Sequence, residues 1–444
     1  IRAAFPAAGQ WTWETRCSDP LDTGLHGRTG TVVVAPYTGT NPLYRHGMLK
    51  VSADKRYLVH ADGTPFLWIG DTAWVAGLKA TAEDWAQYVS DRREKRFTLL
   101  QISPASAWGA AMDRRNNKPF TDADLSQWNP EYWRGFEAKV QQANESGIYV
   151  LLNGIMEPVS RYPSPEAAAL FARNIVARLY GNFVLFSPSF DSNERQVDLG
   201  NAVGRALREA TDVHLITQHP ATSLKTTLEY YAQDYLDFVG VQTGHAGGRR
   251  EVVYAHALEW NLAAYGVQNH KPVVNMEAFY DAGGTTDPMA AKFRGTALDA
   301  RAVGYISLLT GGKGYTYGAY GLWNWQTDES KPYVWRKAMD LPSSTHMKHM
   351  HNFFAAIEWW KLEPAADVVK NAGRTPTDAI VLARTAAGDL AVAYTSNAAR
   401  IDIDLSGLRV THFQWHNPVT GLAEKAEAIT SGVFTKPPGW EDAV

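Results

Sequence analysis

The 444-residue sequence is poor in features that several classes of protein need. It has one cysteine, Cys17, which excludes an intrachain disulfide and a cysteine-based zinc site. Its formal net charge is −3, so it lacks the basic excess of a nucleic-acid-binding protein. No apolar run reaches the roughly 20 residues that span a bilayer. We therefore predict no nucleic-acid partner and no membrane span.

Several short catalytic motifs are also missing. There is no Gly-x-Ser-x-Gly elbow of a serine hydrolase and no glycine-rich phosphate loop after the first predicted strand. That strand is followed by Asp71-Thr72-Ala73, not by the His-x-His expected of a metal-dependent barrel hydrolase. The histidines within residues 346–351 lie on a predicted helix without a carboxylate at ligand spacing. We therefore predict neither a metal site nor a cofactor.

Aromatic residues are abundant by contrast. They make up 12% of the chain and include 16 tryptophans. Aromatic faces stack on the apolar faces of sugar rings, and they also fill large cores. Composition alone therefore leaves carbohydrate binding and core packing as equal interpretations.

The pattern along the chain predicts three parts. Residues 1–45 contain two β-like runs, 11–15 and 30–34, which we interpret as the trailing half of a sandwich whose other strands precede residue 1 or are absent. Residues 46–362 alternate apolar runs with helical stretches. Residues 363–444 contain evenly spaced strands and a turn at 417–421, which indicate a small antiparallel β-sandwich.

The middle part contains eight apolar runs, the number of strands in a (β/α)8 TIM barrel of the α/β class. They are residues 66–69, 97–102, 149–152, 183–186, 213–216, 238–241, 272–276 and 314–317. Thr81 and Ser164-Pro165 are predicted to begin two of the intervening helices. An open doubly wound sheet is the alternative, and the missing phosphate loop argues against it.

Active sites of such barrels lie at the carboxyl ends of the strands. Asp191 follows the fourth run and Glu277 follows the seventh. Two carboxylates across a barrel mouth are what glycosidic cleavage needs, one to protonate the leaving oxygen and one to attack or to activate water. Glu194 is close enough in sequence to take the acid role in place of Asp191.

Other side chains after the predicted strands are candidates for holding a sugar. The candidate hydroxyl binders are Asp71, Asn153, Gln218, His219, Gln242 and His245. The candidate stacking platforms are Trp74, Trp108, Tyr317, Trp323 and Trp325. Each of these residues has a structural alternative, as a hydrogen-bond partner at the barrel mouth or as part of the core.

Several separated motifs resemble the apiosidase-like glycoside hydrolases. They are Phe66-Leu67-Trp68-Ile69-Gly70-Asp71-Thr72-Ala73-Trp74 with residues 88–92, the glycine-rich run 311–318 with Leu322-Trp323, and the segments 44–49 and 359–364. Two positions depart from the pattern usual in that family. Tyr315 stands in place of a histidine, and Pro188-Ser189-Phe190-Asp191 stands in place of Gly-Gly-Asp.

The resemblance implies a retaining glycosidase that acts on a plant or microbial polysaccharide or oligosaccharide. It implies Glu277 as nucleophile, Asp191 as acid/base and a secreted or periplasmic location, although residues 1–5 show no signal peptide. A retaining pair predicts carboxyl groups about 5–5.5 Å apart. A furanosidase, such as an arabinofuranosidase, would use the same residues. A non-catalytic carbohydrate-binding protein on a barrel scaffold is the alternative from another class.

Overall fold

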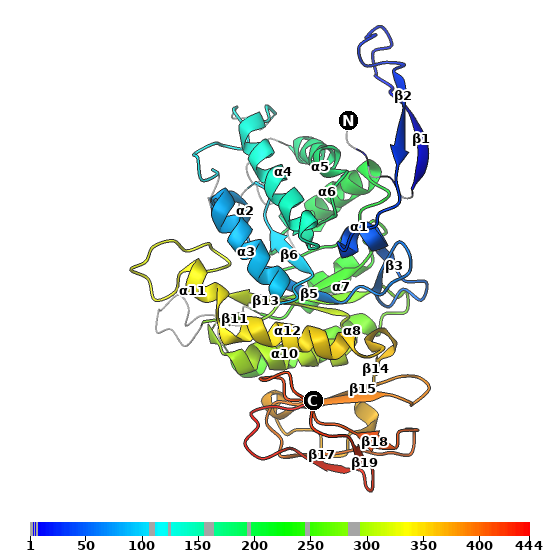
Figure 1. The fold of residues 1–444 in the computed structure, drawn as a ribbon, viewed down its shortest axis with the longest axis vertical. Helices are drawn as coiled ribbons and strands as arrows, with labels where there is room; N and C mark the ends of the chain where they lie inside the picture. The colour runs from blue at the N-terminus through cyan, green and yellow to red at the C-terminus, as the bar shows by residue number, and fades with distance from the viewer. Residues whose placement is uncertain are drawn as a thin grey trace.

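The computed structural model describes residues 3, 5, 8–105, 112–122, 126–154, 164–192, 197–244, 249–282 and 294–444. A β-hairpin lies at one end of the molecule, a curled parallel sheet with helices around it forms the middle, and the C-terminal strands lie at the other end (Figure 1). Among the described residues, no helix has the length and apolar character needed to cross a membrane.

The N-terminal segment is a single projecting hairpin (Figure 1). β1 (Gly9–Glu14) pairs antiparallel with β2 (Thr29–Val34), and most of their side chains are exposed. A short helix, α1 (Pro42–His46), and a second hairpin of β3 (Leu49–Val51) and β4 (Leu58–His60) follow. The described residues before position 45 thus contain a two-stranded hairpin and the start of α1, and the partial sandwich stays a prediction. The boundaries near residues 45 and 362 stay a prediction.

The middle of the chain is a parallel barrel. Its strands are β5 (Trp68–Thr72), β6 (Leu99–Ile102), β7 (Tyr149–Leu152), β8 (Val184–Phe186), β9 (Val239–Gln242), β10 (Val273–Glu277) and β13 (Gly314–Ala319). β13 pairs with β5 and β10, so the last strand of the barrel lies beside the first. The predicted (β/α)8 architecture is confirmed, with antiparallel β structure on both sides of it along the chain.

The fifth predicted strand is reduced to a single bridge. Ile216 pairs in parallel with Phe186 of β8, and its carbonyl accepts a hydrogen bond from the Asp237 N–H, next to β9. Side-chain oxygens take the backbone N–H groups of this run, because Thr211 Oγ1 accepts from Val213 and His214 and an Asp237 carboxylate oxygen accepts from Ile216. The local hydrogen bonds of these residues explain why an apolar run here does not become a regular strand.

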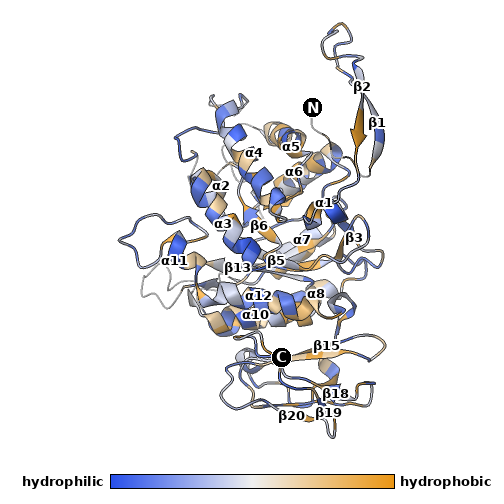
Figure 2. Cartoon of the chain, viewed as in Figure 1, coloured by the Kyte–Doolittle hydropathy of each residue, from blue (hydrophilic) through white to orange (hydrophobic). Residues whose placement is uncertain are grey.

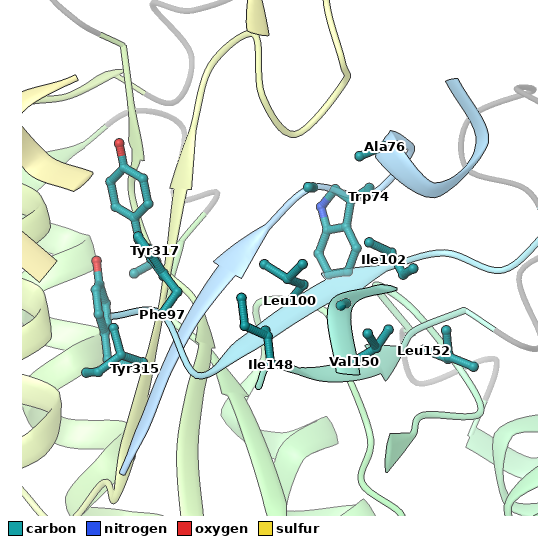
Figure 3. Packing of buried hydrophobic residues seen from close by; sticks show 14 of the residues in the cluster. Trp74, Ala76, Phe97, Leu100, Ile102, Ile148, Val150, Leu152, Tyr315 and Tyr317 are labelled. Carbon is teal, nitrogen blue, oxygen red and sulfur yellow. The ribbon is translucent and has the colours of Figure 1, made fainter. Parts of the chain in front are cut away.

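Alternate strand residues face two different apolar layers. An inner layer fills the barrel near the β3/β4 hairpin and includes Trp68, Leu99, Tyr149, Leu151 and Val274. An outer layer packs against the helices and includes Leu100, Ile102, Val150, Leu152, Tyr315 and Tyr317 (Figure 3). The strands are apolar on both faces, as parallel sheets covered by helices usually are, and they contrast with the partly hydrophilic outer helices (Figure 2).

Several helices around the barrel begin at capping side chains. Thr81 accepts a hydrogen bond from the Asp84 N–H, Ser164 caps the helix that starts with Pro165, and Thr296 forms a capping box with Asp299. The helices are α2 (Ala76–Lys79), α3 (Ala82–Glu94), α4 (Pro130–Glu145), α5 (Pro165–Leu179), α6 (Val197–Ala210), α7 (Leu224–Tyr231), α8 (Arg250–Tyr265), α10 (Ala297–Leu309), α11 (Trp335–Met339) and α12 (Pro342–Ala355). Two short strands, β11 (Tyr280–Asp281) and β12 (Arg294–Gly295), extend the sheet beside β13.

The C-terminal part is built from short antiparallel pairs. These are β14 (Glu363–Pro364), β15 (Ile380–Arg384) and β16 (Ala391–Thr395), then β17 (Arg400–Asp402) with β20 (Val433–Thr435), and β18 (His412–Phe413) with β19 (Glu427–Ala428). The 3₁₀ turns are η3 (Trp359–Lys361), η4 (Ala366–Val368) and η5 (Pro376–Asp378). The predicted turn at 417–421 is present, closed by the Gly421 N–H on the Asn417 carbonyl.

A buried ion pair joins this C-terminal part to the barrel. Arg301 of α10 donates to both carboxylate oxygens of Asp442, and the Arg301 and Asp442 side chains are 1% and 0% exposed. The Tyr394 hydroxyl of β16 donates to the same carboxylate, and its ring stacks on Tyr305 of α10 at 4.8 Å. Removing one member of such a pair leaves a buried charge without its partner, which is costly.

We expect Arg301→Met to lower the free energy of unfolding by about 3–5 kcal/mol, because it leaves the Asp442 carboxylate buried without its cation. Urea unfolding measures this change. The control is Arg400→Met, whose pair with Asp402 is solvent-exposed on the arginine side and is expected to be worth less than about 1 kcal/mol. Equal effects of the two substitutions would contradict a stabilising role for the buried pair.

Acid is expected to destabilise the fold through the buried His214 and His346 and the half-buried His351. Burial lowers the pKa of His214 to about 4 and the pKa of His351 to about 4, and burial with the nearby Arg301 lowers the pKa of His346 to about 3. Each folded pKa lies below the unfolded value near 6.5, so the unfolded chain binds more protons between about pH 4 and 6.5. The free energy of unfolding should therefore fall as pH drops through this window. Urea unfolding at several pH values tests this, and His351→Gln should flatten the profile.

Candidate active site

Three side chains converge at the carboxyl ends of the barrel strands. Asp191, His219 and Glu277 each place one carboxylate oxygen or ring nitrogen so that the three atoms lie within 4.8 Å of one another. His219 Nε2 is 3.2 Å from Glu277 Oε2, and these two side chains are 0% and 1% exposed. The two carboxylates predicted from the sequence are therefore neighbours in space, with an imidazole between the strands that carry them.

A β-bulge turns Glu277 toward the inside of the barrel. Asn275 pairs with Val241, but Glu277 pairs with Gln242, so Met276 is an extra residue in β10. Val274 and Met276 both belong to the inner apolar layer, and simple alternation would direct Glu277 outward. The bulge restores the inward direction one residue later. The Glu277 carbonyl is fixed by the N–H groups of Thr243 and Gly244, where a Cβ at position 244 would lie 2.3 Å from the Ala278 carbonyl oxygen.

The segment after β8 holds Asp191 in an uncommon backbone conformation. Asp191 has a φ of +48°, in the left-handed region that aspartate tolerates better than most residues. Its neighbour Ser192 forms a parallel bridge with Pro220, and Ser192 Oγ accepts a 2.6 Å hydrogen bond from Gln218 Nε2. The loops after the fourth and fifth barrel positions are thus bound together. This contact holds the segment that carries Asp191.

Aromatic rings form a wall beside the carboxylates. Trp74 packs edge-on against Phe190 at 4.5 Å and against His219 at 5.3 Å. Its indole N–H donates a 2.9 Å hydrogen bond to the Tyr280 hydroxyl. Tyr280 in turn lies nearly parallel to Trp323, at a centroid distance of 5.9 Å and an interplanar angle of 10°. Trp323 is half-buried, so part of its side chain is open to solvent.

The predicted hydroxyl binders that carry side-chain amides are Asn153, Gln218 and Gln242, and they lie at the same end of the barrel. Asn153 donates to Gln101 Oε1, and Gln101 Nε2 donates to the Met276 carbonyl, which links the second, third and seventh barrel strands below Glu277. The side-chain oxygens of Asn153, Gln218 and Gln242 are buried without a hydrogen-bond partner among the described residues. Buried acceptors of this kind are ready to receive hydroxyl donors from a ligand or water.

Three predicted sugar contacts point elsewhere. Asp71 accepts hydrogen bonds from the Tyr88 hydroxyl and from Arg92 Nε, both of α3, at 2.7 and 2.6 Å. Tyr317 is in register with Asp71 on the neighbouring strand, and its hydroxyl bonds to Ser343 of α12. Trp325 stacks on Trp335 of α11 at 4.3 Å. All three face the helix layer, because strand alternation directs Asp71 and Tyr317 outward, and we leave them out of the proposed site.

Trp108, His245 and the alternative acid Glu194 lie outside the described residues. Their predicted roles stay predictions.

One residue of this site was not predicted. Tyr280 lies at the start of β11, three residues after Glu277, and its hydroxyl is hydrogen-bonded to the Glu277 carboxylate. Burial, together with that carboxylate, raises the pKa of Tyr280 well above its ordinary value, so the phenol stays protonated. The sequence signal that could have identified it is the aromatic pair Phe279-Tyr280, which closely follows Glu277.

The donor set is also one that metals use. In a tetrahedral zinc site with zinc–ligand distances of about 2.0–2.2 Å, neighbouring ligand atoms are about 3.4 Å apart. The 3.2 Å distance between His219 Nε2 and Glu277 Oε2 is close to this spacing. The ligand atoms of Asp191, His219 and Glu277 together lie within 4.8 Å of one another. A sugar fits this site better than a metal ion, because it gives each group a role. The two neighbouring carboxylates would cleave the glycosidic bond, the buried acceptors would bind hydroxyl groups, and the half-buried tryptophan would stack on the ring.

Barrel, carboxylate pair and aromatic wall together define a glycoside hydrolase, and comparisons with known proteins agree. The profile of the apiosidase-like catalytic domain matches residues 52–361, well over half of the chain. The chain therefore belongs to the apiosidase-like family, as the sequence motifs suggested. No curated protein matched the chain.

Solved structures of glycoside hydrolases share the fold. One described as a glycoside hydrolase has a TM-score of 0.81 at 19% identity, covering 91% of this chain and 97% of that one. A family 5 glycoside hydrolase from Bacteroides vulgatus ATCC 8482 has a TM-score of 0.80 at 20% identity, covering 90% of this chain and 93% of that one. A family 5 mannosidase from Rhizomucor miehei has a TM-score of 0.51 at 10% identity, covering 70% and 97%. Similarity at this level of identity concerns the fold alone.

We predict that Asp71→Asn weakens the fold without changing substrate binding. The Asp71 and Arg92 side chains are both 0% exposed, so loss of their ion pair should lower the free energy of unfolding by about 3–5 kcal/mol. KM, measured at a temperature where the variant is folded, should equal that of the wild type. A raised KM with unchanged stability would instead return Asp71 to the substrate site.

Proposed function

We propose that the protein hydrolyses an O-glycosidic bond in a plant or microbial polysaccharide or oligosaccharide by a retaining double displacement. The observation that carries the proposal is the approach of Asp191 and Glu277, whose nearest carboxylate oxygens lie within 4.8 Å. Retaining pairs are separated by about 5–5.5 Å, while inverting pairs need about 6.5–9.5 Å to admit a water molecule. The spacing therefore supports retention.

Glu277 attacks the anomeric carbon in the first step. The bond from that carbon to the leaving oxygen breaks, and the Asp191 carboxyl gives its proton to that oxygen. In the second step a water molecule attacks the anomeric carbon, Asp191 takes the proton of the water, and the bond to Glu277 breaks. Both carboxyl groups return to their starting states, and the sugar leaves with its original anomeric configuration.

The surrounding side chains suggest how the sugar is held. The buried oxygens of Asn153, Gln218 and Gln242 would accept hydrogen bonds from sugar hydroxyls. The half-buried ring of Trp323 would stack on an apolar sugar face. His219, at 3.2 Å from Glu277, would contact either the nucleophile or a hydroxyl beside the anomeric carbon. A secreted or periplasmic location stays a prediction of the family resemblance.

The test is a screen of aryl glycosides and of plant and microbial polysaccharides with the wild type and Glu277→Ala. Sugar release should occur with the wild type and be abolished in the variant, since the proposed nucleophile that forms the glycosyl-enzyme is then missing. Glu259→Ala, on the exposed face of α8, is the matched control and should retain full activity. Activity in Glu277→Ala would contradict the nucleophile assignment. Binding without release by every variant would favour the carbohydrate-binding alternative.

Asp191→Ala separates the acid from the nucleophile. On substrates with poor leaving groups, kcat should fall by about 10²–10⁴-fold, because proton transfer to the leaving oxygen is lost. A dinitrophenyl leaving group needs no proton, so the first step should persist. Azide should then restore turnover and give a glycosyl azide of retained configuration. Absence of azide rescue would move the acid role to another carboxylate, with Glu194 tested next.

A further inference from the structure

The hydrogen bond between Trp74 and Tyr280 has a fixed direction. An indole N–H is a donor only, so Trp74 Nε1, at 2.9 Å, must donate to the Tyr280 oxygen. That oxygen then accepts from Trp74, and the phenolic proton is free to point at another acceptor. Both side chains are almost fully buried, at 1% and 4% exposure, so water does not compete for these positions.

The acceptor of that proton is Glu277. The Tyr280 hydroxyl is hydrogen-bonded to the Glu277 carboxylate, and a carboxylate can only accept. The chain of donors therefore runs from Trp74 through Tyr280 to Glu277. Tyr280 stays protonated next to this carboxylate, as its strongly raised pKa indicates.

The ring of Trp74 contacts the other half of the site. It lies 4.5 Å from the ring of Phe190, the residue directly before Asp191, and 5.3 Å from His219. Phe190 and His219 are themselves 5.3 Å apart, so the three rings form one cluster. The backbone at Asp191, with φ +48°, leaves the ordinary helical and extended regions directly after this cluster. Trp74, which follows β5, thus contacts both Tyr280, which is bonded to Glu277, and Phe190, which directly precedes Asp191.

We propose that Trp74 and Tyr280 are positioning residues that hold Glu277 through a one-way relay of hydrogen bonds, with the Trp74 ring also bracing the segment that carries Asp191. The inference rests on the proposed retaining mechanism. It adds a specific consequence, because Glu277 is a carboxylate before the first step, an ester after it, and a departing carboxylate in the second step. A donor fixed on this group stabilises its charged form, so Tyr280 acts most strongly when the glycosyl-enzyme breaks down.

Steady-state kinetics of Tyr280→Phe tests this consequence. With an activated aryl glycoside, kcat should fall by about 10- to 100-fold, the range for a hydrogen bond to a charged group. KM should fall with it, because slow breakdown lets the glycosyl-enzyme accumulate. The acid limb of the kcat/KM profile should also move to higher pH, since the carboxylate has lost a donor. A general loss of structure would not produce this combination.

Tyr315→Phe is the matched control. Tyr315 is a fully buried barrel tyrosine whose hydroxyl has no hydrogen-bond partner among the described residues, and it faces the helix layer. Its kcat, KM and pH profile should equal those of the wild type. Equal profiles for Tyr280→Phe and Tyr315→Phe would overturn the proposal.

Trp74→Phe tests the direction of the relay. It removes the indole N–H and keeps an aromatic ring, so it should change kcat and KM in the same sense as Tyr280→Phe. In the Tyr280→Phe background, its effect on the acid limb should disappear, because no relay remains to be oriented. Additive shifts in the double variant would show that Trp74 does not act through Tyr280.

A measurement independent of activity separates this inference from the proposed function. The Glu277 carboxyl is followed by ¹³C NMR in protein labelled at glutamate, with Glu277→Gln used to assign the signal. It should titrate at a higher pH in Tyr280→Phe than in the wild type and be unmoved in Tyr315→Phe. An unmoved signal in Tyr280→Phe overturns the relay. A moved signal in a protein that cleaves no glycoside supports the relay and refutes the proposed function.

Discussion

The structure at the barrel mouth depends on one constraint, a glutamate carboxylate with 1% exposure at the end of β10. A buried charge of this kind is stable only where polar groups surround it. The β-bulge at Met276 turns it inward, and His219 and Tyr280 then meet it from two other segments of the chain. Those contacts in turn fix the aromatic wall, because Tyr280 is bonded to Trp74 and Trp74 packs on Phe190. The geometry of the proposed catalytic site and the local packing are thus the same set of interactions.

Carboxyl groups occur in two kinds of setting in this protein. Asp71 with Arg92 and Arg301 with Asp442 are opposite charges with close hydrogen bonds, and both pairs join one layer of the fold to another. Asp191 and Glu277 are instead two carboxyl groups held near each other, the arrangement on which the proposed mechanism rests. Burial alone does not separate the two settings, since Asp71 and Glu277 are buried to almost the same extent.

The sequence predicted the architecture well, and the roles of the site residues stay predictions. Apolar runs with intervening helical patterns identified seven of the barrel strands. The fifth run failed as a regular strand because side-chain oxygens of Thr211 and Asp237 accept its backbone N–H groups. Glu277 was predicted because it directly follows its run. Asp71 and Tyr317 were assigned to the site for the same reason, and the prediction could not tell inward from outward because both faces of a parallel strand are apolar. Tyr280 was missed because its position depends on a bulge, which no local pattern specifies.

Trapping of the covalent intermediate tests the central claim most directly. The protein is incubated with activated 2-deoxy-2-fluoro glycosides of the sugar found in the substrate screen, and the intact mass and the labelled peptide are determined by mass spectrometry. The account predicts one added glycosyl group per chain, attached to Glu277, and none in Glu277→Gln. Stable labelling of another residue, or hydrolysis with inversion of the anomeric centre, would contradict it.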